Sequence, residues 1–200
     1  FPAFLSFLLS PLSKIGKIQA LIRFKLISII RALQSIFDGA HYYTRQEETE
    51  SEVLFVSHLT NRRQILKDND AYFGDLPNQF LQNGISNSIV LINHAKVSKK
   101  KVLEGWSDSK IQRFILSSSL NFISEVSTYF SQLNSKRQLK SILKGLQIDE
   151  VLAQDILNNQ LSSNTFNALR VARQVTDIAR KTNAKFIVTT YEGHAWERLV

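Results

Sequence analysis

The side chains best suited to chemistry lie near the end of this sequence, in the stretch FIVTTYEGHAWERLV at positions 186–200. Glu192 and His194 follow an apolar run that is typical of a buried strand, and Gly193 lies between them. A carboxylate in such a loop can accept the proton of an attacking hydroxyl, or it can orient an imidazole that does so. Glu192 is therefore our first candidate for a catalytic base, and His194 is its rival.

Trp196, Glu197 and Arg198 follow in the same stretch and are candidates for contact with a substrate. The indole of Trp196 could stack on the face of a sugar or a base. A purely structural interpretation also stays open. In it, Glu192 and Glu197 are acids at the start of a helix, where the helix dipole favours a carboxylate. Trp196 then belongs to the core, and Arg198 pairs with one of the acids.

A second polar loop, SHLTNRR, follows the apolar run EVLFVS and contains His58, Asn61 and Arg62. Such a loop could hold a phosphate or a hydroxyl-rich acceptor through hydrogen bonds, some of them charge-assisted. His58 is a further candidate for the catalytic base, whereas Asn61 and Arg62 are candidates for substrate binding. The alternative is a polar loop with a histidine whose hydrogen bonds are satisfied within the protein.

A third stretch, DNDAYFGDLP, combines acids and aromatic residues, and four of its residues are candidates for substrate contact: Asp70, Tyr72, Gly74 and Asp75. Acids and aromatic rings together in an ordered loop suit a carbohydrate ligand. The Gly and Pro of this stretch are equally typical of a simple turn. Both interpretations stay open at this point.

Several familiar motifs are absent. The sequence has no G-x-G-x-x-G after a strand, no G-x-x-x-x-G-K-[ST] and no G-x-S-x-G, so usual dinucleotide binding, P-loop chemistry and a typical α/β-hydrolase are not supported. It has no Cys, which excludes disulfides and thiolate catalysis. His58, His94 and His194 could meet in space, but no ligand spacing such as H-E-x-x-H occurs. We therefore predict no metal site, and no cofactor bound by this segment.

These loops must be positioned by strands and helices that alternate along the chain. Each of four short apolar, β-branched runs predicts a buried strand, and the segments between them have helical periodicity. Such alternation predicts an α/β fold with a Rossmann-like, mainly parallel sheet and flanking helices. The strands are expected at 52–57, 85–94, 111–118 and 184–190, and the helices at 76–84, 120–133, 135–146, 148–159 and 165–183, with Asp149 and Ser162 or Ser163 as caps.

In a parallel sheet, ligands bind beyond the carboxyl ends of the strands. This rule selects four loops, at 57–63, 94–101, 117–121 and 191–198. Three of them carry a histidine, and only the last carries carboxylates as well. We therefore expect the candidate residues of these loops to lie along one edge of the sheet.

An amphipathic, basic helix is predicted to precede this domain. The chain has a net charge of +8, and its first 40 residues contribute several lysines and arginines to a helix with one apolar stripe. The pattern favours contact with an anionic membrane surface through residues 14–37, and the alternative is packing on a neighbouring domain. Interleaved basic residues and Pro11 argue against a membrane span. The stripe comprises Ile15, Ile18, Ile22, Leu26, Ile29, Ile30, Leu33, Ile36 and Phe37.

The sequence therefore divides into a helical segment at 1–40, a polar linker at 41–51 and a Rossmann-like domain at 52–200. It contains no Met, even at position 1, so we expect the chain to be part of a longer protein. The basic run KVSKKK at 96–101 is expected to be a solvated surface. No recognition motif accompanies it, so we predict no specific nucleic-acid partner.

Three stretches together, LFVSHLTN, DAYFGDLPNQFLQNG and TTYEGHAWERLV, resemble bacterial surface-carbohydrate biosynthesis proteins. These are glycosyltransferases of the O-antigen and capsule type with a GT-B-like architecture. The resemblance covers roughly residues 50–200 through short motifs. It rests on a polar loop after the first strand, a Tyr-Phe-Gly-x-Leu stretch before the first crossover helix, and a Glu-x-x-x-Trp-Glu pattern formed here by Glu192, Trp196 and Glu197.

The resemblance implies the N-terminal, acceptor-side domain of a glycosyltransferase. Its nucleotide-sugar donor would bind a C-terminal domain that this chain lacks, and its acceptor would be a carbohydrate or a lipid-linked carbohydrate. The implied base is Glu192, with His58 and His194 as rivals. The implied location is the cytoplasm, peripheral on the inner face of the plasma membrane. The alternative function is a non-catalytic α/β binding or assembly domain at the membrane surface.

Overall fold

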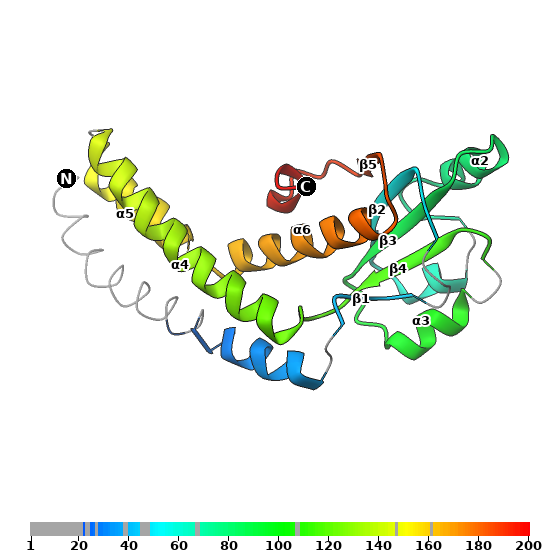
Figure 1. Ribbon diagram of the computed structural model, residues 1–200, viewed down its shortest axis with the longest axis horizontal. Coiled ribbons are helices and arrows are strands. Elements are labelled where there is room, and N and C mark those ends of the chain that lie inside the picture. The colour runs from blue at the N-terminus through cyan, green and yellow to red at the C-terminus, as the bar shows by residue number, and fades with distance from the viewer. Residues whose placement is uncertain are drawn as a thin grey trace, which may run out of the picture. The chain divides into compact units, whose positions relative to one another are not determined.

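The computed structural model describes residues 22, 25–26, 28–37, 40–44, 49–66, 69–106, 109–146, 148–160 and 162–200. The chain forms two compact units (Figure 1). The helical unit comprises Phe1–Gly39 and Asn121–Ala168, and the sheet unit comprises Ala40–Leu120 and Leu169–Val200. The sheet unit contains every residue that we singled out as a candidate for catalysis or substrate binding.

The sheet unit is built on a five-stranded sheet with the order β1-β4-β3-β2-β5. The pairs β2–β3, β3–β4 and β2–β5 are parallel, and only the short edge strand β1 runs antiparallel to its neighbour β4. The strands are β1 (Tyr42–Tyr43), β2 (Val53–Leu59), β3 (Asn87–Asn93), β4 (Gln112–Leu116) and β5 (Phe186–Thr189). This confirms the α/β, Rossmann-like fold and the positions of all four predicted strands. Strand β5 was expected to be buried, but it lies at the edge of the sheet, and Phe186 is 61% exposed.

Strand β1 was not predicted, because two tyrosines give no recognisable strand pattern. It lies within the segment 41–51 that we expected to be a linker, and it pairs Tyr42 with Leu116 and Tyr43 with Ile115 of β4. The ring of Tyr42 also packs edge-on against Phe114, with the centroids 5.3 Å apart. Contacts with the sheet, rather than local propensity, hold this segment extended.

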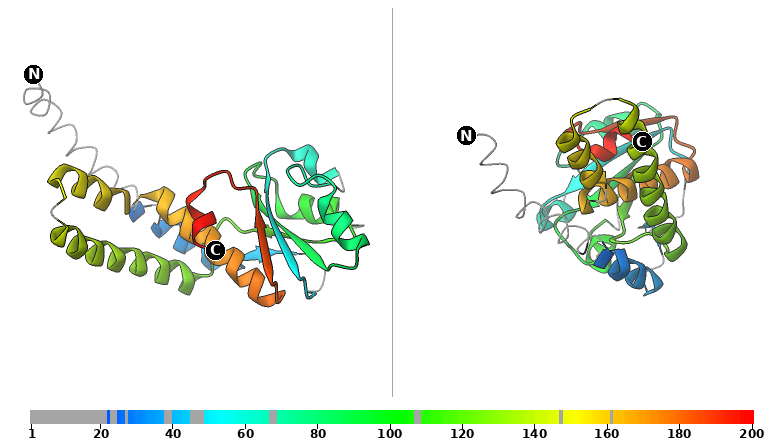
Figure 2. Two further views of the ribbon diagram at one scale, coloured as in Figure 1. Left: turned by 90° about the horizontal axis from the view of Figure 1, so that it is seen from above. Right: turned by 90° about the vertical axis from the view of Figure 1, so that its left-hand side faces the viewer.

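Helices connect the parallel strands and cover both faces of the sheet. The 3-10 helix η1 (Arg62–Leu66) and helix α2 (Leu76–Gln82) lead from β2 to β3, and α3 (Lys99–Gly105) leads from β3 to β4. The chain returns to β5 through α6 (Ser163–Lys181). Helices α2 and α3 lie on one face of the sheet, and the part of α6 within the sheet unit lies on the other (Figures 1 and 2).

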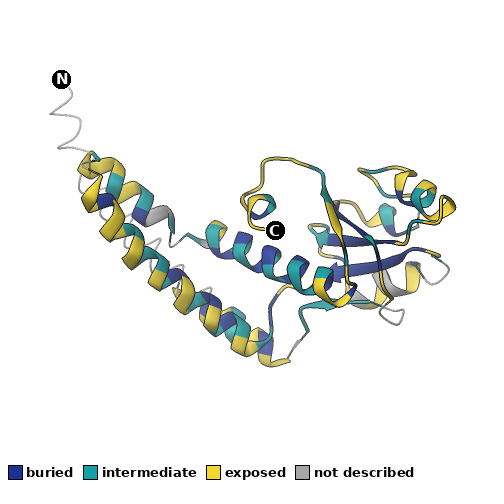
Figure 3. Ribbon diagram, turned by 45° about the horizontal axis from the view of Figure 1, so that its top comes forward, coloured by how far each residue is buried: buried dark blue, intermediate teal, exposed yellow. Residues whose placement is uncertain are grey.

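The core of the sheet unit consists of the apolar side chains of the central strands. All seven residues of β2 are buried, as are those of β4 and the first five of β3. Alternation along β2 directs Val53, Phe55 and Leu59 into a cluster with α2 and η1 residues. In Figure 3 the central strands are accordingly buried, whereas the chain after β5 is mostly exposed.

The strand order reverses at β2. From β2 the chain proceeds to β3 and then β4 on one side, and it returns to β5 on the other side of β2. In open α/β sheets, ligands bind outside the carboxyl ends of the strands at such a reversal, because the adjacent loops diverge there and leave a crevice. The fold therefore directs attention to the loops that follow β2 and β5.

The helical unit contains part of the N-terminal helix, α4 (Phe122–Gly145), α5 (Glu150–Gln160) and the first residues of α6. The carboxylate of Asp149 accepts hydrogen bonds from the backbone N–H groups of Val151 and Leu152, and the Ser162 hydroxyl accepts one from Thr165. Both predicted caps are confirmed. The helices predicted at 120–133 and 135–146 form the single helix α4, because no Gly or Pro interrupts the sequence between them.

Residues 28–37 form the described continuous part of the N-terminal helix. Its small polar residues Ser28 and Ser35 are buried, at 8% and 2% exposure, whereas its apolar stripe faces outward. The stripe residues Ile22, Leu26, Ile29, Ile30, Leu33 and Ile36 are 51–60% exposed, and Phe37 is 90% exposed. Ile15, Ile18 and the basic residues before position 22 lie outside the described residues.

Among the helices that the structure describes, none is both long enough and apolar enough to cross a membrane.

Candidate functional site

The candidate site lies at the carboxyl ends of β2 and β5, where the strand order reverses. His58 was expected in the loop after the first strand, but it is the next-to-last residue of β2, because the parallel pairing with β3 continues through Leu59. The parallel register pairs Val56 of β2 with Thr189 of β5. If this register is continued by two residues, His58 comes level with Tyr191, and Glu192 follows directly. The fold thus brings together two segments that are far apart in the sequence.

Three histidines and a carboxylate meet at this position. Nδ1 of His58 lies 2.9 Å from Nε2 of His94, and the two rings stack with their centroids 5.1 Å apart. The ring of His194 lies 5.4 Å from that of His58, and its Nε2 lies 3.2 Å from a carboxylate oxygen of Glu192. One donor atom each from His58, Glu192 and His194 lie within 4.8 Å of one another. We call these three residues the His–Glu–His cluster.

The loop that carries Glu192 and His194 is held by Glu197. One carboxylate oxygen of Glu197 accepts a hydrogen bond from the backbone N–H of Glu192, and the other accepts one from the N–H of His194. The loop turns sharply, with positive φ angles of 51° at Tyr191 and 77° at Gly193. A glycine tolerates such a conformation without strain, so Gly193 allows the two reactive side chains to approach each other. Glu197 therefore orders the loop.

His58 is only 2% exposed, and burial disfavours the charged form of its imidazole. Burial, and after it the neighbouring His94, lower the pKa of His58 below its usual value, and Glu192 opposes this with a smaller effect in the other direction. His58 is therefore neutral at pH 7. Its Nε2 atom is buried and has no hydrogen-bond partner among the described residues.

The loop after η1 lies beside the cluster. A carboxylate oxygen of Asp70 accepts hydrogen bonds from the Ser57 hydroxyl and from the backbone N–H groups of Tyr72 and Phe73. The ring of Tyr72, which is exposed, lies 5.5 Å from that of His58. Asp70 also pairs with Gly74 through two backbone hydrogen bonds, and Gly74 has a positive φ of 58°. Asp70 thus fixes the turn that carries Tyr72 toward His58.

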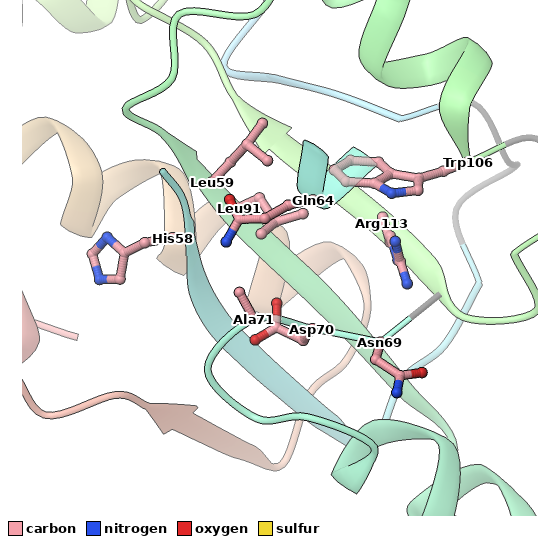
Figure 4. Close-up of a pocket in the computed structure, with 9 residues that line it drawn as sticks. All are labelled: His58, Leu59, Gln64, Asn69, Asp70, Ala71, Leu91, Trp106 and Arg113. Carbon is pink, nitrogen blue, oxygen red and sulfur yellow. The ribbon is translucent and has the colours of Figure 1, made fainter. Parts of the chain in front are cut away.

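A small cavity of about 10 Å³ lies next to this turn, large enough for about one water molecule. Figure 4 shows that the ring of His58 points away from the other residues that line the cavity. The cavity is lined by His58, Leu59, Gln64, Asn69, Asp70, Ala71, Leu91, Trp106 and Arg113. It is too small for a sugar, so a substrate would have to approach the exposed residues of the His–Glu–His cluster, Glu192 and His194.

The structure brings together only some of the residues singled out in the sequence. One group of contacts contains His58, Asp70, Tyr72, Gly74, Glu192, His194, Trp196 and Glu197. Trp196 is 5% exposed, and its ring lies 6.3 Å from that of His58, so it packs behind the cluster and offers little surface for stacking.

The remaining predicted site residues make local contacts. Asn61 accepts a hydrogen bond from the backbone of Arg63, and Asp75 accepts one from the Asn78 side chain. Both residues are exposed, as are Arg62 and Arg198. None of these four has a described contact with the cluster.

Two further residues belong to the site but were given no catalytic or binding role from the sequence, although His94 was expected to be able to meet His58 and His194 in space. His94 follows β3 and bonds to His58, and its position in a loop after a strand was the available signal. Tyr191 is 83% exposed at the rim, immediately before Glu192. With Tyr72 it provides the exposed aromatic surface that the buried Trp196 lacks.

The arrangement can support two kinds of chemistry. A half-exposed carboxylate next to an imidazole can take up a proton from a hydroxyl that approaches from solvent. Exposed tyrosine rings beside such a base can hold the apolar face of a sugar. A buried, neutral histidine with a free ring nitrogen can instead accept a hydrogen bond or ligate a metal ion.

The fold and the cluster define a Rossmann-like α/β protein with a polar site at its topological switch point. No protein-family model matches the chain, and no curated protein or solved structure matches it either. The geometry of the site therefore carries the functional argument.

Proposed function

We propose that this chain is the acceptor-side domain of a glycosyltransferase that builds a surface polysaccharide. The observation that carries the proposal is the pairing of Glu192 with His194, at 3.2 Å, directly beside the buried His58 at the switch point of the sheet. A proton acceptor in this position faces the crevice in which α/β sheets bind ligands. The resemblance of the sequence to surface-carbohydrate glycosyltransferases supports the same function.

In the proposed reaction, a hydroxyl group of the acceptor attacks the anomeric carbon of a nucleotide-sugar. The bond from that carbon to the new oxygen forms, and the bond to the phosphate oxygen breaks. The nucleoside phosphate departs with the bonding electron pair, and Glu192 receives the hydroxyl proton. His194 holds the Glu192 carboxylate in place, while Tyr72 and Tyr191 flank the sugar of the acceptor.

The donor would be bound by a second Rossmann-like domain. Glu192 and His194 are exposed in this chain, and closure of a facing domain would exclude water from the reacting groups. Exclusion of water favours transfer to the acceptor over hydrolysis of the donor. This arrangement would also account for the lack of a nucleotide-binding motif in the present sequence.

The N-terminal helix supports a position at the cytoplasmic face of the plasma membrane. The described residues of its apolar stripe are more than half exposed, and the face of the helix that carries the small side chains Ser28 and Ser35 is buried. An apolar groove of about 330 Å³ lies beside the stripe within the helical unit, lined by Lys25, Ser28, Ile29, Ala32, Glu125, Val126, Tyr129 and Phe130. Such a surface suits the interface of a membrane whose lipids are also the source of a lipid-linked acceptor.

This position predicts a loss of vesicle binding when the stripe is interrupted. Replacing Leu33, which is 54% exposed, by aspartate should weaken binding to vesicles that contain anionic lipid by about tenfold or more, because a leucine contributes about 1.5 kcal/mol or more when it leaves water. Gln34→Asp is the matched control, since it introduces the same charge at an exposed position beside the stripe. Cosedimentation measures both, and equal losses for the two variants would contradict the membrane role of the stripe.

The experiment that tests the function is a turnover assay with nucleotide-sugars on the full-length protein. Transfer of the sugar, with release of the nucleoside phosphate, supports the proposal. A protein that binds carbohydrate but turns over no donor would instead fit the alternative of a non-catalytic binding or assembly domain.

A further inference from the structure

We infer that the His–Glu–His cluster is a binding site for a divalent transition metal, of which Zn²⁺ is the foremost candidate. The inference goes beyond the proposed transfer reaction and stands on the cluster alone. Two imidazoles and one carboxylate are a donor set that suits zinc and related ions, and they leave coordination positions open for water or a substrate oxygen.

The geometry of the donor atoms supports this assignment. One donor atom each from His58, Glu192 and His194 lie within 4.8 Å of one another. In a tetrahedral site with bonds of about 2.1 Å, the donor atoms lie about 3.4 Å apart. The three donor atoms would have to move only a short distance toward one another to hold an ion. This movement falls on the loop of Glu192 and His194, where Gly193 gives the backbone conformational freedom.

The buried nitrogen of His58 is the second, independent observation. His58 is 2% exposed, and its Nε2 has no hydrogen-bond partner among the described residues. A buried polar atom without a partner costs roughly 1–3 kcal/mol. In the tautomer in which Nδ1 of His58 carries the proton, Nδ1–H donates to Nε2 of His94 at 2.9 Å. Nε2 of His58 then presents its lone pair, which is the form in which histidine binds metals.

The surroundings of the cluster resemble the outer shell of a metal site. Ligating histidines usually donate their second ring nitrogen to a neighbouring group, which fixes the ring orientation. His94 occupies that position for His58. Glu197 holds the backbone N–H groups of both Glu192 and His194, and so fixes the loop that carries the other two ligands. Glu192 and His194 are exposed, which gives an ion a path from solvent.

A bound ion would change the role that we assign to Glu192. The carboxylate would then bind the ion, and an acceptor hydroxyl coordinated to the same ion would lose its proton more readily. The metal site can be tested without the transfer reaction, because binding is measured directly. A failure of metal binding therefore leaves the proposed transferase activity intact, and a failure of transfer leaves the metal site intact.

The test is a titration of the full chain with Zn²⁺, followed by calorimetry, and a parallel titration with Co²⁺, followed by its visible absorption. We expect saturable binding of one ion per chain and a Co²⁺ spectrum of low coordination number. Glu192→Gln and His194→Gln should each weaken Zn²⁺ binding by more than the roughly 10–100-fold that is typical for loss of an outer-shell partner. Both residues are exposed, so both variants are expected to fold.

Glu104→Gln is the matched control, because Glu104 is an exposed carboxylate of α3 whose described ion pair is with Lys100. It should bind Zn²⁺ like the unaltered chain. The midpoint of thermal unfolding should also rise with Zn²⁺ concentration in the control and not in Glu192→Gln. The inference is overturned if no saturable binding is found, or if Glu192→Gln and His194→Gln bind as tightly as Glu104→Gln.

Discussion

Replacing Glu192 by glutamine is expected to lower the rate of sugar transfer by about 10²–10⁴-fold, the usual contribution of a general base. Glutamine has almost the same shape but cannot take up the proton of the acceptor hydroxyl. It keeps an oxygen that can face His194, so the loop held by Glu197 should persist. The effect should therefore fall on kcat, with little change in KM for the donor.

The rate is measured in the full-length protein, together with the nucleotide-sugar-binding domain that the proposal requires. Glu104→Gln serves as the control for loss of an exposed carboxylate far from the cluster in sequence, and it should leave the rate unchanged. A Glu192→Gln enzyme with nearly normal turnover would remove Glu192 from the reaction. His58 and His194 would then be the remaining candidates for the base.

Replacing Phe55 by alanine should lower the free energy of unfolding of the sheet unit by about 3–5 kcal/mol. Phe55 has 0% exposure in the middle of β2, and its ring packs against Phe73 and Phe80 with centroid distances of 5.1 and 5.5 Å. The substitution removes this apolar contact and leaves a cavity that a closely packed core fills only in part. Because β2 also carries His58, the loss is expected to loosen the site as well.

The measurement is urea unfolding followed by tryptophan fluorescence. Both tryptophans of the chain, Trp106 and Trp196, are buried in the sheet unit, so the signal reports on this unit. Phe186→Ala is the matched control, because Phe186 begins β5 with 61% exposure. It should cost less than about 1 kcal/mol. Similar losses for the two variants would contradict the assignment of Phe55 to the centre of the core.

The parallel strands could be predicted because each is a short apolar run. The sheet largely buries β2, β3 and β4, whereas the edge strand β5 stays partly exposed. A run such as VLFVSHL, with seven residues, is too short for a typical helix and is therefore read as a strand. Helix α3 could not be predicted in the same way. Its sequence KKKVLEG has no apolar periodicity. We expected the basic run at 96–101, whose last three residues begin this helix, to be only a solvated surface. The position of α3 is set by the crossover from β3 to β4.

The sequence left open whether the apolar stripe of the N-terminal helix packs inward or faces outward. An isoleucine-rich stripe commonly packs inward, but here Ser28 and Ser35 are buried and Ile30 and Leu33 are exposed. The small serines allow close approach, and the hydroxyl of Ser35 donates to the carbonyl oxygen of Ala32 within the helix. A helical wheel gives the position of the stripe but does not reveal which face meets the rest of the unit.

The site could be predicted only in part, because the sequence does not reveal how the strands and loops pack against one another. The sequence placed His58, Glu192 and His194 after strands, and parallel pairing implied that their loops share one edge. It could not show that β5 lies next to β2, because that depends on the strand order. The hydrogen bond between His58 and His94, and the burial of Trp196 behind them, likewise follow only from the packed sheet.

The central claim is that the cluster at the switch point serves transfer of a sugar to a lipid-linked acceptor. It is tested most directly by incubating the full-length protein with labelled nucleotide-sugars and membrane lipid, and then by following the label into the lipid fraction. We predict that label enters the lipid fraction with the unaltered protein and does so about 10²–10⁴-fold more slowly with Glu192→Gln. Label that stays with the nucleotide for every donor, while the protein is folded and bound to the membrane, would contradict the claim.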